Sequence, residues 1–134
     1  MTHHWKTNFT ENEILESEGF VYQVTNLKDG TKYIGKKFIW SKRKIRQKGT
    51  TRRKHIKSES NWRTYTSSSK ILNADIDKLG KSSFLFEILS IHKTRSDTNY
   101  RELYLQVMND VLNLKDNKGN YAFYNMNIMC KFFR

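Results

Sequence analysis

Apolar and aromatic side chains dominate two short stretches, residues 20–26 and 31–39, that are separated by turn residues. Both stretches are rich in the β-branched and aromatic residues that strands favour. Asp29-Gly30, which lies between them, is a turn signal found in hairpins. The pattern therefore predicts a β-hairpin in the first third of the chain.

The predicted hairpin brings two tyrosines beside a glycine. Side chains alternate between the faces of a strand, so Tyr33 and Gly35 share one face. A two-residue or a four-residue loop would bring Tyr22 to that same face, and the longer loop sets it opposite Gly35. A three-residue loop with a bulge would break this pairing. The glycine would leave a hollow with phenol oxygens at its rim, although both tyrosines could also be ordinary strand residues.

Capping signals organise the chain on either side of this hairpin. Thr10 and Glu13 have the spacing of a capping box, so we expect a short helix within an N-terminal arm, residues 1–18, that lies outside the main core. Ser41 would cap a short basic helix, and residues 48–60 would form a loop. The basic helix would hold Arg43, Lys44 and Arg46.

The second half of the chain has the spacing of two helices with a strand between them. Ser67-Ser68-Ser69 would cap the first helix, whose inward residues would be Ile71, Leu72, Ile76 and Leu79. Residues 84–91 are expected to form a buried strand.

The second helix should begin near Asp97. Its inward stripe would comprise Tyr100, Leu103, Tyr104, Val107, Val111 and Leu114. Glu102 lies away from the centre of that stripe, so it could line a cleft or face water.

The positive charge of the chain is concentrated in one segment. The formal net charge is +12, and eleven basic residues without an acidic one lie between Lys36 and Lys57. Such a block favours a polyanion, most naturally nucleic acid, over a merely solvated charge run. The block has too few apolar residues for a membrane helix, and no apolar run has membrane-spanning length, so we expect a cytoplasmic protein without a membrane partner.

In their order along the chain, these features resemble the GIY-YIG endonucleases. Val21-Tyr22 is similar to the end of the first signature, and Tyr33-Ile34-Gly35 is the second signature, with Gly35 as its structural glycine. Arg43 stands eight positions after Gly35, where the family places its catalytic arginine. Glu102 lies in the helix that carries the family's metal-binding glutamate. Asn125 follows a tyrosine near the end of the domain, as in the family.

The resemblance covers roughly residues 19–127 and departs from the family at two positions. The stretches "YIGKKF" and "NWRTYTSSSKIL" are similar to small phage-encoded members, the endonuclease II and Seg-type homing enzymes. Phe20 stands where the first signature has its glycine. Gln47 stands where many members carry a histidine, so the resemblance does not identify a histidine base.

The resemblance implies a fold of the α/β (α+β) class, with a small, largely antiparallel three-stranded sheet flanked by helices. Residues 19–134 would form this single domain, with a basic insert at about 44–60. The implied function is metal-dependent cleavage of DNA by a phage protein in the bacterial cytoplasm. The alternative is a basic nucleic-acid-binding module without catalysis, and a ribosome-associated structural protein is a third interpretation. The sequence does not distinguish homing from degradation of host DNA.

The resemblance also implies a role for each site residue. Glu102 would bind one Mg²⁺ or Mn²⁺ ion per active site, and Arg43 would clamp the scissile phosphate. Tyr22 would act as the general base or align the water, if nearby cations or the metal favour its phenolate. Tyr33 would hold the water or a phosphate oxygen, and the two tyrosines could exchange roles. Asn125 would support the site by hydrogen bonding.

Basic residues around this site would anchor double-stranded DNA through its phosphates. They are Lys36, Lys37, Lys44, Arg46, Lys48, Arg52, Arg53, Lys54 and Lys70. One active site cuts one strand, so cutting both strands would require a homodimer, a homotetramer or sequential nicks.

Overall fold

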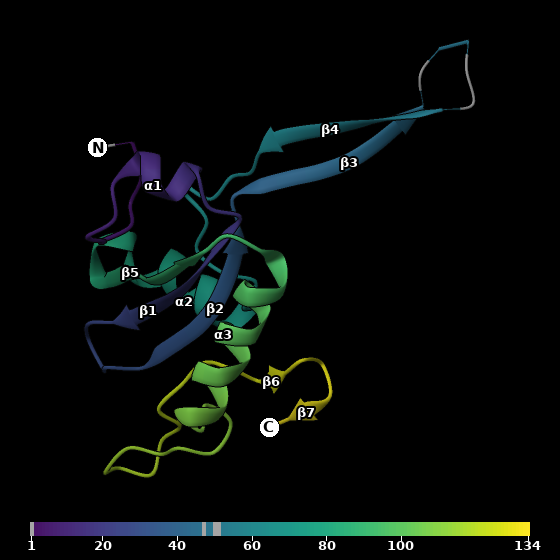
Figure 1. Cartoon of the computed structure of the whole chain (residues 1–134). Coiled ribbons are helices and arrows are strands. Elements are labelled where there is room, and N and C mark those ends of the chain that lie inside the picture. The colour runs from purple at the N-terminus through teal and green to yellow at the C-terminus, as the bar shows by residue number, and fades with distance from the viewer. Residues whose placement is uncertain (1, 47, 50–51) are drawn as a thin grey trace.

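The computed structural model describes residues 2–46, 48–49 and 52–134 (Figure 1). The elements are α1 (Glu11–Leu15), β1 (Gly19–Asn26), β2 (Lys32–Phe38), β3 (Trp40–Arg46), β4 (Arg53–Glu59), α2 (Lys70–Leu79), the 3₁₀ turn η1 (Lys81–Ser83), β5 (Phe84–His92), α3 (Arg95–Met108), β6 (Asn127–Ile128) and β7 (Phe132–Phe133).

The central sheet has three antiparallel strands in the order β2-β1-β5. Alternating residues of the sheet contribute to two hydrophobic clusters. Tyr22 packs in the cluster that contains Leu72 of α2, whereas Val21 and Ile34 pack in a second cluster with Leu103 of α3. The two longer helices therefore cover opposite faces of the sheet, and the expected α+β fold is confirmed.

The first hairpin has the register that a four-residue loop gives. Tyr22 lies opposite Gly35, and the Asn26 backbone N–H donates to the Thr31 carbonyl at 2.8 Å, so residues 27–30 form the loop. Tyr22, Tyr33 and Gly35 consequently share the face that α2 covers, as the alternation of side chains predicts.

The N-terminal segment belongs to the core, so the prediction that it lies outside is wrong. Trp5 is 1 % exposed, and both Trp5 and Ile14 pack with Tyr22 in the larger hydrophobic cluster. The Lys6 backbone N–H donates to the Phe86 carbonyl at 2.7 Å, forming a parallel bridge to β5. This segment thus covers the outer edge of β5, which would otherwise be an open sheet edge.

The basic segment forms a two-stranded hairpin, so the predicted short helix after Ser41 and the predicted loop over residues 48–60 are both wrong. Strands β3 and β4 pair along their whole length, and Arg43 lies opposite Ile56. The hairpin projects away from the three-stranded sheet (Figure 1). The pairing of two neighbouring segments as a hairpin overrides the local helical signals, and a short sequence window does not reveal that pairing.

Helix α3 begins close to the predicted position, and Leu103 and Val111 of the predicted stripe pack in the second hydrophobic cluster, but other members of the stripe do not face inward. Tyr100, Tyr104 and Val107 are exposed, whereas Thr98 and Gln106 are buried. Gln106 faces the edge of β2, where its Nε2 donates to the Ile34 carbonyl, so a polar side chain occupies part of the inner face of the helix. In α2 the prediction holds for Leu72 and Ile76, which are buried, but not for Ile71, which is exposed.

Among the residues that the structure describes, no helix is long and apolar enough to cross a membrane.

Candidate active site

The site is built around the outer edge of β2. Because β2 ends the sheet, the backbone groups on this edge must find partners outside the ladder. Asn125 supplies two of them, since its Oδ1 accepts from the Ile34 N–H at 3.1 Å and its Nδ2 donates to the Ile34 carbonyl at 2.9 Å. Gln106 Nε2 donates to the same carbonyl at 3.1 Å. Asn125 therefore positions the second signature through its side-chain amide.

The two signature tyrosines pack directly over Gly35. A Cβ atom at Gly35 would lie 2.6 Å from the Tyr22 hydroxyl and 2.8 Å from Cε2 of Tyr33. Only a glycine leaves room for both rings at this point of the strand. The hollow that the sequence predicts is thus occupied by the Tyr22 ring, which is buried.

A third tyrosine, Tyr65, joins this pair, although no pattern in the sequence points to it. Its ring centroid lies 6.2 Å from that of Tyr22, and Nζ of Lys37 lies 4.1 Å from its ring centroid. Tyr65 stands in an irregular segment, where no periodicity marks its direction. The Tyr33 hydroxyl lies 3.3 Å from the Ser68 hydroxyl, which follows in the same segment.

Glu102 approaches the edge of β2 from the opposite face of the sheet. Its Oε1 atom lies 3.7 Å from Nζ of Lys36, and the side chain of Glu102 is 21 % exposed. Asn99, one turn earlier on α3, accepts a short hydrogen bond from the Lys36 ammonium group. The side chains of Asn99, Glu102 and Gln106, all on α3, therefore lie at the edge of β2.

A cavity of about 580 Å³, which we call the Glu102 cavity, brings these elements together. Its lining residues are Tyr33, Lys36, Ser68, Ser69, Lys70, Ile71, Glu102, Gln106, Asn125, Met126, Asn127, Met129 and Cys130. The cavity combines one carboxylate, two ammonium groups and several hydroxyls. This set of groups suits a bound phosphate with a hard cation.

Burial governs the titration of the acidic groups at the site. It raises the pKa of the Glu102 carboxyl, and the neighbouring Lys36 offsets this only in part. Burial raises the pKa of Tyr22 well above its ordinary value, and Tyr33, Tyr65 and Glu102 act in the same direction when they are ionised. Burial likewise raises the pKa of Tyr33. The phenols are therefore neutral near pH 7, where they can donate hydrogen bonds.

The structure gathers only part of the predicted set of site residues. Tyr33, Lys36, Lys70, Glu102 and Asn125 line one cavity, with Tyr22 packed against Tyr33 behind it. Lys37 projects from the other face of β2, toward Tyr65. The remaining predicted DNA-binding residues belong to the projecting hairpin and its tip. They are Lys44, Arg46, Lys48, Arg52, Arg53 and Lys54.

Arg43 does not reach the Glu102 cavity. It is exposed on β3 and is not among the residues that line the cavity. A strand rises about 3.3 Å per residue, more than twice the rise of a helix, so the hairpin carries Arg43 outward from the end of β2. Gln47, one of the two departures from the family pattern, lies outside the described residues.

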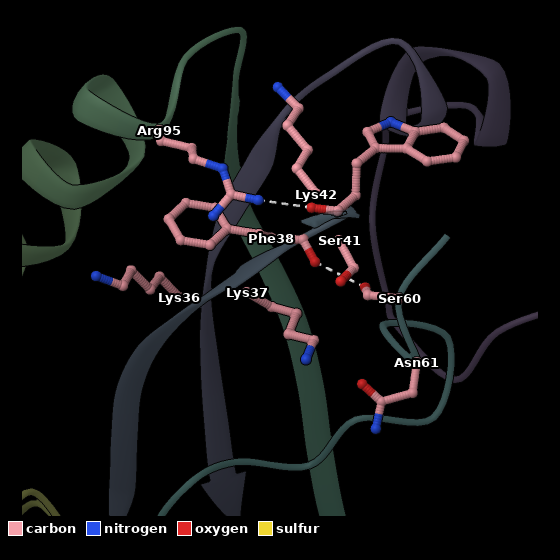
Figure 2. Close-up of a pocket in the computed structure, with 9 residues that line it drawn as sticks. Lys36, Lys37, Phe38, Ser41, Lys42, Ser60, Asn61 and Arg95 are labelled. Carbon is pink, nitrogen blue, oxygen red and sulfur yellow. Dashed lines mark hydrogen bonds between the residues drawn. The ribbon is translucent and has the colours of Figure 1, made fainter. Parts of the chain in front are cut away.

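A different arginine, Arg95 in the first turn of α3, lies beside the end of β2. Its Nη2 donates to the Trp40 carbonyl at 2.7 Å, and its guanidinium carbon lies 4.1 Å from the centroid of the Phe38 ring (Figure 2). Nothing in the sequence singles out this residue, because an arginine at the start of a helix carries no motif.

Three features together define a GIY-YIG domain: a hairpin whose two tyrosines pack over a glycine, a glutamate on helix α3, and an asparagine that hydrogen-bonds the second signature. Residues 3–128 match the family described as "Putative endonuclease segE, GIY-YIG domain". The chain therefore belongs to this family of GIY-YIG endonuclease domains. Neither the curated proteins nor the solved structures include a match.

Proposed function

We propose that the protein is a metal-dependent endonuclease that hydrolyses phosphodiester bonds of double-stranded DNA. The observation that carries this proposal is the Glu102 cavity, where Tyr33, Lys36, Lys70 and Glu102 converge at the edge of β2. Nuclease family membership supports the same reaction class.

The residues at this cavity fit a hard cation such as Mg²⁺ or Mn²⁺. Mg²⁺ commonly uses one or two protein carboxylates and leaves its other positions to water and substrate phosphate. Glu102 would hold the ion, and the described residues contain no cluster of three or more potential His, Cys, Asp or Glu ligands. When bound, the ion would stabilise charge on the scissile phosphate and the leaving oxygen.

The remaining groups would bind and orient the phosphate. Lys36 and Lys70 provide positive charge on two sides of the cavity. The neutral Tyr33 hydroxyl can donate a hydrogen bond to a phosphate oxygen or to the attacking water while Ser68 fixes its position. Tyr22 packs behind Tyr33, and its raised pKa favours a supporting role over that of a general base.

The β3–β4 hairpin would anchor the duplex beside the cavity. Its register places Lys42 directly opposite Lys57. The phosphates of DNA would be attracted to the positive charge of the hairpin, in addition to the pairing of Lys42 with Glu18. These contacts would position the DNA without reading its sequence.

A non-catalytic DNA-binding module is the second candidate. The position of Arg43 on the exposed hairpin favours it, because the residue expected to clamp the scissile phosphate is outside the Glu102 cavity. In that case the hairpin would bind DNA and the cavity would have no chemical role.

Cleavage of supercoiled plasmid separates the two candidates. We expect the wild type with Mg²⁺ to nick the plasmid, and Glu102→Gln to lose activity by on the order of 10²-fold or more, because the metal-binding carboxylate is replaced by a neutral amide. Glu16→Gln, which removes an exposed carboxylate, is the matched control and should cut normally.

Binding of DNA by the same variants completes the test. Glu102→Gln should still bind DNA at least as tightly as the wild type, because it removes a negative charge close to phosphates. Tight binding by the wild type without cleavage in Mg²⁺ or Mn²⁺ would instead identify a binding module.

We further propose that the protein acts as a phage enzyme in the cytoplasm of a bacterial host, either in homing or in degradation of host DNA. If each chain cuts one strand, cutting both strands would take a homodimer, a homotetramer or successive nicks. Comparing nicked and linear plasmid over a range of protein concentrations would distinguish assembly from sequential nicking.

A further inference from the structure

A second cavity, of about 520 Å³, lies beside the Glu102 cavity and shares Lys36 with it. We call it the Arg95 cavity (Figure 2). Its lining residues are Lys36, Lys37, Phe38, Trp40, Ser41, Lys42, Ser60, Asn61 and Arg95. Four of these nine side chains are cationic and none is a carboxylate, so the cavity is built for an anion.

The guanidinium of Arg95 is held in a fixed position at this cavity. It donates to the Trp40 carbonyl at 2.7 Å, and its Nε lies 3.4 Å from Oε1 of Glu18. Its planar group also stacks on Phe38 (Figure 2). An arginine fixed in this way has little side-chain freedom left before any ligand arrives, which lowers the entropic cost of binding an anion.

The positive charge at the Arg95 cavity exceeds the negative charge that faces it. Glu18 alone pairs with both Arg95 and Lys42, the latter at 2.7 Å. Lys36 pairs with Glu102, and Lys37 lies over the ring of Tyr65. Two carboxylates therefore face four cations, and an additional anion would balance the excess.

We propose that the Arg95 cavity binds the DNA backbone phosphate next to the scissile one, with Arg95 as the residue that positions it. This inference rests on the proposed nuclease function. Because Lys36 lines both cavities, a strand with its scissile phosphate at Glu102 places a neighbouring phosphate near Arg95. A stacked nucleobase fits less well, because the guanidinium already covers one face of the Phe38 ring.

The test couples one protein side chain to one phosphate. A duplex cut by the wild type is first used to map the cleavage position. The same duplex is then synthesised with a single neutral methylphosphonate at each successive position, and binding is measured by fluorescence anisotropy in the non-cleaving Glu102→Gln background. Arg95 is intact in one protein and replaced by Gln in the other, which keeps a donor for the Trp40 carbonyl.

Neutralising the phosphate adjacent to the cut should weaken binding about tenfold when Arg95 is present and leave it unchanged in Arg95→Gln. A change confined to one phosphate cannot come from general loss of folding. Arg101→Ala, which removes an exposed arginine of the same helix, is the control and should keep the full effect.

Two results would overturn the inference. One is the same loss of affinity at every position, with and without Arg95. The other is an Arg95-dependent loss of affinity only when a phosphate far from the cut is neutralised. Failure of the wild type to cleave any duplex would contradict the proposed function instead. The binding scan would still show whether Arg95 holds a phosphate.

Discussion

Glu102 is a half-buried carboxylate, and its burial disfavours the ionised form in the folded protein. Its interactions with Lys36 do not cancel the effect of burial, so its pKa is raised. A site that binds a divalent cation would gain from this arrangement, because the ion supplies the charge compensation that the protein alone does not provide.

The raised pKa of Glu102 makes a prediction about stability and pH. The folded protein holds this proton more tightly than the unfolded chain, so the stabilising contribution is complete below the ordinary glutamate pKa and is lost as pH rises through the folded value. Without metal, Glu102→Gln should therefore gain melting temperature over the wild type as pH rises toward neutrality. A constant difference at all pH values would contradict the shift.

Single residues differ in how far the sequence reveals their roles. The placement of Gly35 between two tyrosines follows from strand alternation, which needs only local pairing. By contrast, the hydrogen bond between Asn125 and Ile34 joins residues 91 positions apart. The position of Tyr65 depends on an irregular segment. No local pattern encodes such long-range pairs, so only the resemblance to a family pointed to Asn125, and nothing pointed to Tyr65.

At the level of elements, the β3–β4 hairpin illustrates where local patterns fail. Its basic residues predict a polyanion partner from charge alone, but the strand pairing depends on two segments that meet across a turn. Because the segment is a strand rather than the expected helix, Arg43 lies outside the Glu102 cavity. For helix α3 the prediction fails only in part: Leu103 of its apolar stripe packs inward, but the buried residues Thr98 and Gln106 are polar and lie outside that stripe.

The hairpin provides a prediction about salt dependence. The double substitution Lys44→Ala, Arg46→Ala should weaken DNA binding, because each side chain would neutralise a phosphate. The slope of log affinity against log salt should become shallower by up to about 0.9 for each phosphate that the variant no longer neutralises. Cleavage at saturating DNA should remain, because neither residue lines the Glu102 cavity.

Fluorescence anisotropy over a series of salt concentrations measures this slope. Lys28→Ala, Lys118→Ala removes the same charge from exposed sites away from the hairpin and is the matched control. An equal change of slope in both double variants would mean that the hairpin contributes only net charge.

At the scale of the whole molecule, the N-terminal segment completes the core around the three-stranded sheet. Trp5 fills the face of the sheet that carries Tyr22, with ring centroids 5.1 Å apart, and its indole N–H donates to the Trp62 carbonyl. The sequence did not show this, because a lone tryptophan in a polar stretch has no periodicity.

Trp5→Ala should therefore lower the free energy of unfolding by about 3–5 kcal/mol, as for other fully buried aromatic residues. Urea denaturation measures the change. Phe133→Ala removes an exposed aromatic side chain and should change the stability by less than about 0.5 kcal/mol. Equal small effects in both variants would place the N-terminal segment outside the folded core after all.

A crystal structure of the protein with Mn²⁺ and a short DNA duplex, in which anomalous scattering locates the metal, would test the proposed nuclease site itself. We predict one strong anomalous peak at the Glu102 carboxylate, with a backbone phosphate between it and the hydroxyl of Tyr33. DNA bound along the hairpin, with neither metal nor phosphate in the Glu102 cavity, would contradict the proposed site.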